Sequence, residues 1–299
     1  MVYHEKRKIN SKVLNYLVYN KRVDGKFKKI SKFIGNGKLS KQRVAKFKKE
    51  FENELKISIN SENLTKEQFL EIENLKEIYY NKIKKFDKNN FNEAFFTELT
   101  YDSNAIEGST LSLSDTSLII NEGIVPKGKT LREINEAKNH LEAIKFIKNY
   151  KGDLNEILIL KLHKIILNNI FPRFAGVYRN KNVRIRGSDV KLPSHEKVPQ
   201  LIKNLIYWYK KNKSSLHAFE LSIIFSIKFV TIHPFIDGNG RVSRLLMNLL
   251  LGKFGYPWIN IRFKNRKEYL EAVREGNYKK YKKIIRFAIQ QLKENIEDF

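Results

Sequence analysis

Apolar residues recur at helical spacing from residue 41 to the end of the chain, and this periodicity constrains the fold more than any other feature. In stretches such as FELSIIFSIKFV, which begins at Phe219, they return every three or four residues. Thr65 with Gln68 and Thr130 with Glu133 have the spacing of a capping box in front of such stretches. We therefore expect a mainly α fold with about ten helices.

The first 38 residues break this period and resemble short strands. The segments VYHEKRKI, VLNYLVYN and KFKKISKFI are separated by the turn signals Asn10-Ser11 and Asp24-Gly25. The Gly-Asn-Gly at 35–37 ends them as a plain turn, and Ser40 is placed to cap the helix that follows. The pattern predicts a small antiparallel β appendage with one helix over residues 1–60, and a helical core over 61–299.

A second interruption is the segment KNVRIRGSDVKLPSH, residues 181–195. Val183 and Ile185 alternate with arginines, and Gly187 opens a turn, so the pattern predicts a β-hairpin. A lone hairpin in a helical domain is either a surface feature or a flap over a site, and periodicity alone does not choose between them.

Composition excludes several kinds of site. The absence of cysteine excludes disulfides, thiolate metal sites and a cysteine nucleophile, and the six scattered histidines do not form the motif of a structural zinc site. No leading apolar segment or uninterrupted apolar run suggests a leader or a membrane span, so we expect a cytoplasmic protein that does not enter a membrane.

The formal net charge is +26, which suits either a nucleic-acid partner or a general compositional bias that keeps the chain soluble. No single basic stripe dominates the core. Residues 1–40 are the exception, because they carry eleven Lys or Arg residues against Glu5 and Asp24. Nucleic acid therefore stays open as a partner of residues 1–40.

The stretch HPFIDGNGRVSR, residues 233–244, joins two helical segments. Pro234 pushes its predecessor out of the helical region, so one helix should end near His233. The apolar face that begins at Val242 means that Gly238-Asn239-Gly240 opens the next helix instead of closing a hairpin.

These residue types suit phosphate chemistry. Glycines and free amides at a helix start form a cradle for phosphate oxygens, and Arg241 and Arg244 can bind phosphate from one side of the helix. Asp237 is a single hard carboxylate of the kind that holds Mg²⁺ together with substrate phosphates. His233 at a helix C-terminus, where the helix dipole favours the imidazolium, could take a proton from an incoming nucleophile.

The same stretch resembles the Fic family signature, His-Pro-Phe-x-Asp/Glu-Gly-Asn-Gly-Arg-x-x-Arg, and matches it at every defined position. Weaker similarity covers residues 95–290 and includes AGVYR, LPSHEKVPQLIKNL and EYLEAV. Nothing before residue 60 belongs to it. The resemblance implies a helical fold with a β-hairpin flap, and transfer of AMP from ATP to a hydroxyl of a protein, with release of pyrophosphate.

Position by position, the resemblance implies His233 as the base for the target hydroxyl and Asp237 as the Mg²⁺ ligand. It makes Gly238, Asn239 and Gly240 the anion hole, Arg241 a phosphate contact and Arg244 the partner of the γ-phosphate. Phe235 packs the loop onto the core. The flap, with Val183, Ile185 and Gly187, would hold target backbone as an added strand.

Residues 101–108 include SNAIEG, which is similar to the inhibitory pattern of class II Fic proteins, in which a helix precedes the core. Ser103 and Glu107 are four residues apart on one helical face, and Gly108 ends the helix. In this interpretation Glu107 pairs with Arg244 and removes it from the γ-phosphate.

Three functions remain open from the sequence. The first is an autoinhibited AMP transferase acting on an unidentified protein or on itself. The second is an enzyme whose main or additional reaction removes AMP, with the inhibitory glutamate positioning a water. The third is a basic nucleic-acid-binding protein whose Fic core senses nucleotide. Relatives often dimerise, and a homodimer is also open.

Overall fold

A computed structural model describes residues 2–9, 12–23, 26–61, 63–185 and 189–298. The chain divides into two compact units, Met1–Ser61 and Glu62–Phe299. Each unit is described by itself.

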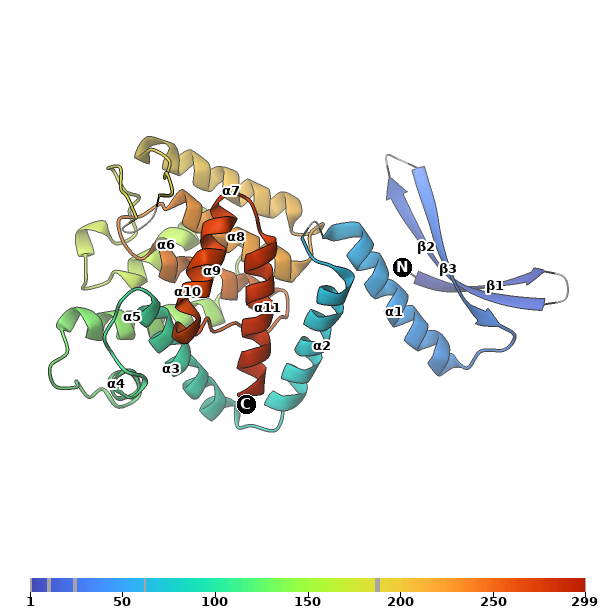
Figure 1. Ribbon diagram of the computed structural model, residues 1–299, viewed down its shortest axis with the longest axis horizontal. Helices are drawn as coiled ribbons and strands as arrows, with labels where there is room; N and C mark the ends of the chain where they lie inside the picture. Colours follow the sequence, from blue (N-terminus) through green and yellow to red (C-terminus); the bar gives the residue numbers. More distant parts are fainter. Residues whose placement is uncertain (1, 10–11, 24–25, 62, 186–188, 299) are drawn as a thin grey trace. The chain divides into compact units, whose positions relative to one another are not determined.

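The first unit is a three-stranded sheet with one helix (Figure 1). Its strands β1 (Val2–Ile9), β2 (Lys12–Val23) and β3 (Lys26–Asn36) are antiparallel in the order β1-β2-β3, and α1 spans Lys41–Asn60. The predicted cap is present, because Ser40 Oγ accepts a hydrogen bond of 3.2 Å from the Arg43 amide. The predicted turns at 10–11 and 24–25 lie outside the described residues.

The second unit is helical, in agreement with the mainly α prediction. Its helices are α2 (Lys66–Ile83), α3 (Lys88–Ile106), α4 (Leu113–Ser117), α5 (Leu131–Asn149), α6 (Glu156–Ile166), α7 (Val198–Asn212), α8 (Ala218–Ile232), α9 (Asn239–Lys253), α10 (Arg266–Asn277) and α11 (Lys282–Glu297). One π turn, Leu118–Glu122, continues α4, and short 3₁₀ turns cover 172–174, 195–197 and 263–265. Both predicted capping boxes are formed, at Thr65 with Gln68 and at Thr130 with Glu133.

Helices α8 and α9 form the centre of this unit (Figure 1). Helix α8 is apolar on all sides and buried over most of its length, as expected of a helix enclosed by others. One core cluster joins α8 and α9 to α3, α5, α6 and α7, and a second joins them to α2, α10 and α11. The loop between these two helices, residues 233–238, is therefore held at both ends by buried elements. In the described part of the chain, no helix is both long and apolar enough to cross a membrane.

The predicted strands of the 181–195 hairpin are not formed. Residues 181–185 and 189–194 lie in no β-ladder, and Gly187 falls outside the described residues. Val183 and Ile185 are half-buried with Arg184 exposed between them, so the alternation is real. Side chains join the two arms at their base instead: Arg179 donates to the carbonyls of Lys181 and Pro193, and Asn182 Oδ1 accepts from the His195 amide at 2.9 Å.

Candidate active site

The loop from His233 to Gly238 begins and ends with a residue in the left-handed backbone conformation. His233 caps the C-terminus of α8 with φ of 51°, and Gly238 caps the N-terminus of α9 with φ of 77°. Both helix boundaries agree with the prediction. A histidine in the left-handed region is unfavourable without support. Here the Arg179 side chain supplies it, since Nε donates to the His233 carbonyl at 2.8 Å.

The side chain of Asn239 has a structural role inside the loop, which the sequence did not predict. Its Oδ1 accepts from the Phe235 amide and its Nδ2 donates to the Phe235 carbonyl, both at 2.9 Å. The amide group thus ties the start of α9 to the loop, and only the backbone N–H of Asn239 is left to face an anion at the helix start.

Phe235 fastens the loop to the core as expected. Its ring is fully buried and stacks on His163 of α6, with 3.5 Å between centroids. His163 Nδ1 accepts from the Gly176 amide, and Nε2 faces the Asp237 carbonyl at 3.1 Å. Burial lowers the pKa of His163 to about 4, so the imidazole is neutral and donates this second hydrogen bond. His163 was not singled out from the sequence, because its partners lie far along the chain.

The environment of His233 lowers the pKa of its imidazole. Burial is the main cause, and the Arg179 charge adds to it. The Val230 carbonyl and the carboxylates of Glu107 and Asp237 offset it only partly. The Val230 carbonyl near the helix C-terminus favours the imidazolium, as expected, but the loss of hydration outweighs it. A neutral imidazole at neutral pH is the form that can accept a proton.

Arg244 lies buried under the C-terminal turn of α3. Its Nε donates to Ser103 Oγ at 3.0 Å, and Nη2 donates to the Ser103 carbonyl and to Glu107 Oε1, both at 2.8 Å. The predicted pairing of Glu107 with Arg244 is thus present in the structure. Gly108 adopts φ of +105° directly after the α3 cap, as a helix-ending glycine does.

Glu107 also lies against the first turn of α9. A Cβ atom at Gly240 would overlap the Glu107 carboxylate, so glycine is needed at this position in the paired state. The carboxylate therefore occupies the positive end of α9, next to the backbone amides that the sequence assigned to a phosphate.

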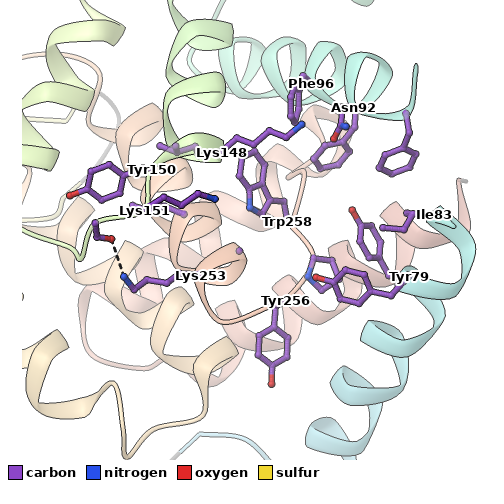
Figure 2. A pocket seen from close by; sticks show the side chains of 18 residues that line it. Tyr79, Ile83, Asn92, Phe96, Lys148, Tyr150, Lys151, Lys253, Tyr256 and Trp258 are labelled. Atoms are coloured by element: carbon purple, nitrogen blue, oxygen red, sulfur yellow. Dashed lines mark hydrogen bonds between the residues drawn. The ribbon is translucent and has the colours of Figure 1, made fainter. Parts of the chain in front are cut away.

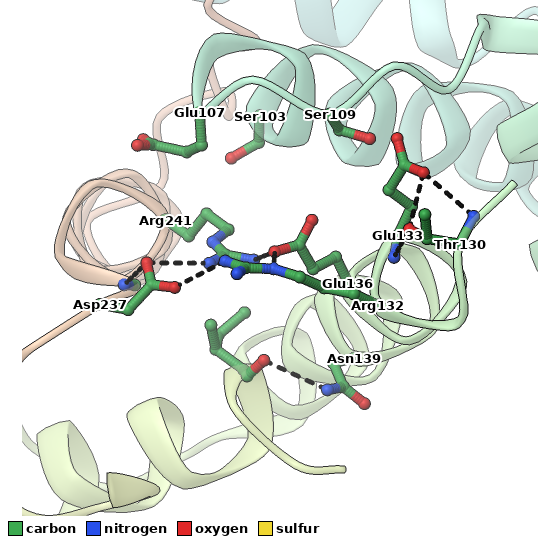
Figure 3. Close-up of polar contacts among 12 residues, drawn as sticks. Ser103, Glu107, Ser109, Thr130, Arg132, Glu133, Glu136, Asn139, Asp237 and Arg241 are labelled. Carbon is green, nitrogen blue, oxygen red and sulfur yellow. Dashed lines mark hydrogen bonds and ion pairs between the residues drawn. The ribbon is translucent and has the colours of Figure 1, made fainter. Parts of the chain in front are cut away.

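Arg241 faces a second set of carboxylates, shown in Figure 3. Its guanidinium is almost fully buried and contacts Glu136 of α5 and Asp237, both at 3.3 Å. Arg132, also from α5, reaches the other Asp237 oxygen at 2.9 Å and contacts Glu136 at 3.1 Å. Four charged side chains from α5, the loop and α9 thus form one alternating network, of which the sequence predicted only Asp237 and Arg241.

The donor set around Asp237 fits Mg²⁺ held mainly by substrate. The described residues contain no group of three or more histidine, aspartate or glutamate side chains that could hold an ion by themselves. Asp237 is about one third exposed, and Mg²⁺ is commonly bound through one or two carboxylates, water and substrate phosphates. Such an ion would compete with Arg132 for Asp237 Oδ2.

A cavity of about 480 Å³ lies elsewhere in the second unit (Figure 2). Aromatic rings from α2, α3 and the segment after α9, among them Tyr79, Phe96 and Trp258, line it with Lys148 and Lys253 at its edge. No residue of 233–244 lines it, so this cavity is separate from the site formed by the loop.

Comparison with known proteins agrees with this site. The family model described as Fic/DOC matches residues 153–251. Protein adenylyltransferase Fic of Nematostella vectensis is 34% identical over 212 residues, which cover 69% of this chain and 49% of that protein. Protein adenylyltransferase fic-1 of Caenorhabditis elegans is 31% identical over 206 residues, 67% of this chain and 40% of that protein. The chain therefore spans half the length of these relatives or less.

Solved structures show the same fold. A Fic-domain-containing signalling protein of Bacteroides thetaiotaomicron superposes with a TM-score of 0.68 at 24% identity, covering 76% of this chain and 94% of that one. Residues 134–508 of C. elegans Fic-1 superpose with a TM-score of 0.67 at 24% identity, covering 86% and 73%. The family match lies over the loop, its two helices and the elements that hold them, and we conclude that this chain belongs to the Fic/DOC family.

Proposed function

We propose that this protein transfers AMP from ATP to a side-chain hydroxyl of a protein. The observation that carries the proposal is the loop between α8 and α9, where a neutral, partly buried histidine lies beside the amide-rich start of a helix and a buried arginine. The names of the curated relatives, protein adenylyltransferases, support the same reaction.

In this mechanism the imidazole of His233 removes the proton of the target hydroxyl. The hydroxyl oxygen bonds to the α-phosphorus of ATP, and the bond from that phosphorus to the bridging oxygen breaks, releasing pyrophosphate. The first amides of α9 stabilise phosphate charge, while Arg241 and Arg244 orient the triphosphate. Asp237 would hold Mg²⁺, which supplies charge neutralisation on the phosphates.

We further propose that Glu107 holds the enzyme in a resting state. Arg244 is buried, and its described hydrogen bonds go to Ser103 and Glu107, so it meets a γ-phosphate only after α3 releases it. The Glu107 carboxylate also lies where a Cβ of Gly240 would be, in front of the helix start. ATP must therefore displace or avoid a negative charge at the position of its own terminal phosphate.

The test is incorporation of label from ATP radiolabelled at the α-phosphate, with ATP labelled at the γ-phosphate as control. We expect Glu107→Gly to label itself or proteins of a cell extract about a hundredfold faster than wild type, which corresponds to about 2.7 kcal/mol. Glu142→Gly, an exposed glutamate of α5, serves as the matched control and should resemble wild type.

Adding His233→Ala to Glu107→Gly should abolish labelling. Label from the γ-phosphate instead would indicate a kinase and contradict the proposal. Equal labelling rates for wild type and Glu107→Gly would contradict the proposed resting state but not the proposed AMP transfer.

Removal of AMP is a second candidate. It is favoured by the interaction of the Glu107 carboxylate with His233, which raises the pKa of the imidazole. A carboxylate and an imidazole so placed can position one water for attack on the phosphorus of an AMP ester, returning the hydroxyl and releasing AMP. Wild type should then release AMP from a target labelled beforehand, whereas Glu107→Gly should not. Release by neither protein would leave transfer as the one reaction.

A further inference from the structure

The sheet of the first unit has two unlike faces. Strand alternation places Val2, Leu17 and Ile34 on one face, where α1 covers them with Phe51. By strand alternation the opposite face carries Tyr3, Glu5 and Arg7 from β1, Tyr16 from β2, and Lys29 and Phe33 from β3. The register pairs both Glu5 and Phe33 with Tyr16, and it pairs Tyr3 with Val18, a fully buried residue of β2. The described side chains of α1 pack on the first face, so we call the second face the open face.

Three aromatic rings lie on the open face. Tyr3 is 42% exposed and Phe33 is 49% exposed, which is unusual for rings on a sheet that has a core of its own. Tyr16 lies directly across from Phe33, with 5.4 Å between their ring centroids. The rings therefore reach across all three strands in place of gathering in the core.

The open face is also positively charged. Arg7 stacks over the Tyr16 ring at 4.2 Å, and Lys29 follows on β3. Glu5, the acidic residue between them, accepts from both cations, at 2.8 Å from Arg7 and 2.9 Å from Lys29. This carboxylate fixes the two cations beside the rings and leaves both partly exposed to solvent. Rings and cations thus alternate over one surface.

We propose that the open face binds single-stranded nucleic acid. Unpaired bases stack on exposed rings of a sheet, while nearby lysine and arginine side chains neutralise the phosphates between them. On this face Arg7 and Lys29 outnumber Glu5, which leaves the positive charge that such a strand needs. A duplex suits the face less well, because its bases are already stacked on one another and do not reach the rings.

The test is binding of a fluorescein-labelled oligothymidylate of about 15 nucleotides to the full chain, followed by fluorescence anisotropy at several salt concentrations. We expect Phe33→Ala and Tyr3→Ala each to weaken binding by about five- to a hundredfold at constant salt. Phe33→Tyr keeps a ring and should bind like wild type, which separates stacking from loss of structure.

Charge elsewhere on the chain requires its own control, because a protein with a net charge of +26 attracts any polyanion. Tyr207→Ala removes a ring of α7 that is 69% exposed and should leave binding unchanged. A blunt-ended duplex of the same length should bind more weakly than the single strand. Duplex binding that is as tight, with no effect of Phe33→Ala, would show attraction by charge alone and overturn the proposal.

Oligouridylate distinguishes the two sources of such a strand. Tighter binding of oligouridylate than of oligothymidylate indicates RNA, and the reverse order indicates single-stranded DNA. Both results support the open face as a platform if Phe33→Ala weakens them equally. Since AMP transfer is measured separately by labelling, failure of this proposal is distinguishable from failure of the proposed reaction.

Discussion

At the scale of single residues, His233 decides how the proposed reaction depends on pH. Burial lowers the pKa of its imidazole below the usual value of about 6.5, so the base stays neutral as the pH falls to that value. Labelling by Glu107→Gly should therefore remain constant from about pH 8 to about pH 6.5 and decline only in more acid solution. Removing Glu107 also removes a charge that raises this pKa, which moves the acid limb further down.

The measurement is the initial labelling rate against pH, with ATP binding followed at each pH so that loss of binding is not mistaken for loss of the base. Far-ultraviolet circular dichroism at the lowest pH confirms that the protein is folded. An acid limb at or above the ordinary histidine pKa would mean that the helix dipole, and not burial, dominates at His233.

Arg132 is a residue whose function follows from the structure alone. It occupies the Asp237 oxygen at 2.9 Å and is about half exposed, so it competes with a divalent ion for one carboxylate. Exposed pairs contribute about 1 kcal/mol or less, and we expect Arg132→Ala to lower the half-saturating Mg²⁺ concentration by about two- to fivefold. The half-saturating Mg²⁺ concentration is measured by titrating Mg²⁺ while following the binding of a fluorescent ATP analogue. Arg286→Ala, at an exposed position of α11, is the control. A higher Mg²⁺ requirement would instead indicate that Arg132 binds the triphosphate itself.

At the scale of elements, the parts of the site written locally in the sequence were predictable. The end of α8 at His233 and the start of α9 at the glycines each depend on a proline or a glycine. The pairing of Glu107 with Arg244 spans 137 residues and was implied by the family resemblance, not by a local pattern. The supports of the loop were not predictable in this way. Arg179 acts on a carbonyl 54 residues away and His163 on one 74 residues away, and no local pattern encodes such contacts. The stretch AGVYR belongs to the family resemblance, but the sequence does not show that its arginine, Arg179, binds the His233 carbonyl.

The hairpin prediction failed for a related reason. Alternation at Val183 and Ile185 reports which side chains turn inward, and the structure retains that alternation. A ladder also requires the two arms to pair, and here Arg179 and Asn182 bind backbone groups at the base of the arms. Periodicity predicts burial more directly than it predicts hydrogen-bond partners.

The loop itself makes a quantitative prediction through Asn239. Asn239→Ala leaves the buried amide and carbonyl of Phe235 without their partner, at about 1–3 kcal/mol for each group, so we expect a loss of about 2–6 kcal/mol in unfolding free energy. Asn239→Asp keeps the acceptor for the amide and should lose about half as much. Urea unfolding followed by tryptophan fluorescence reports on the second unit, where both tryptophans, Trp208 and Trp258, lie. A change below about 0.5 kcal/mol for Asn239→Ala would mean that water replaces the side chain.

At the scale of the whole molecule, the two units have separate cores. Among the residues whose burial is described, the core of the first unit extends to Phe51, and the two large clusters around α8 and α9 begin at Leu64. Every residue assigned to AMP transfer lies in the second unit, and the open face lies in the first. A chain built in this way can carry two activities that fail independently.

The final prediction follows from this division. A protein consisting of residues 62–299 should fold, because the clusters around α8 and α9 contain no residue of the first unit among those whose burial is described. With Glu107→Gly it should label at a rate within about twofold of the full-length Glu107→Gly protein, since the reaction needs no residue before 62. Its affinity for oligothymidylate should fall by at least the amount that Phe33→Ala removes from the full chain.

Loss of labelling in a folded 62–299 protein would assign part of the catalytic machinery to the first unit. Unchanged oligonucleotide binding would move the nucleic-acid site to the basic surface of the helical unit.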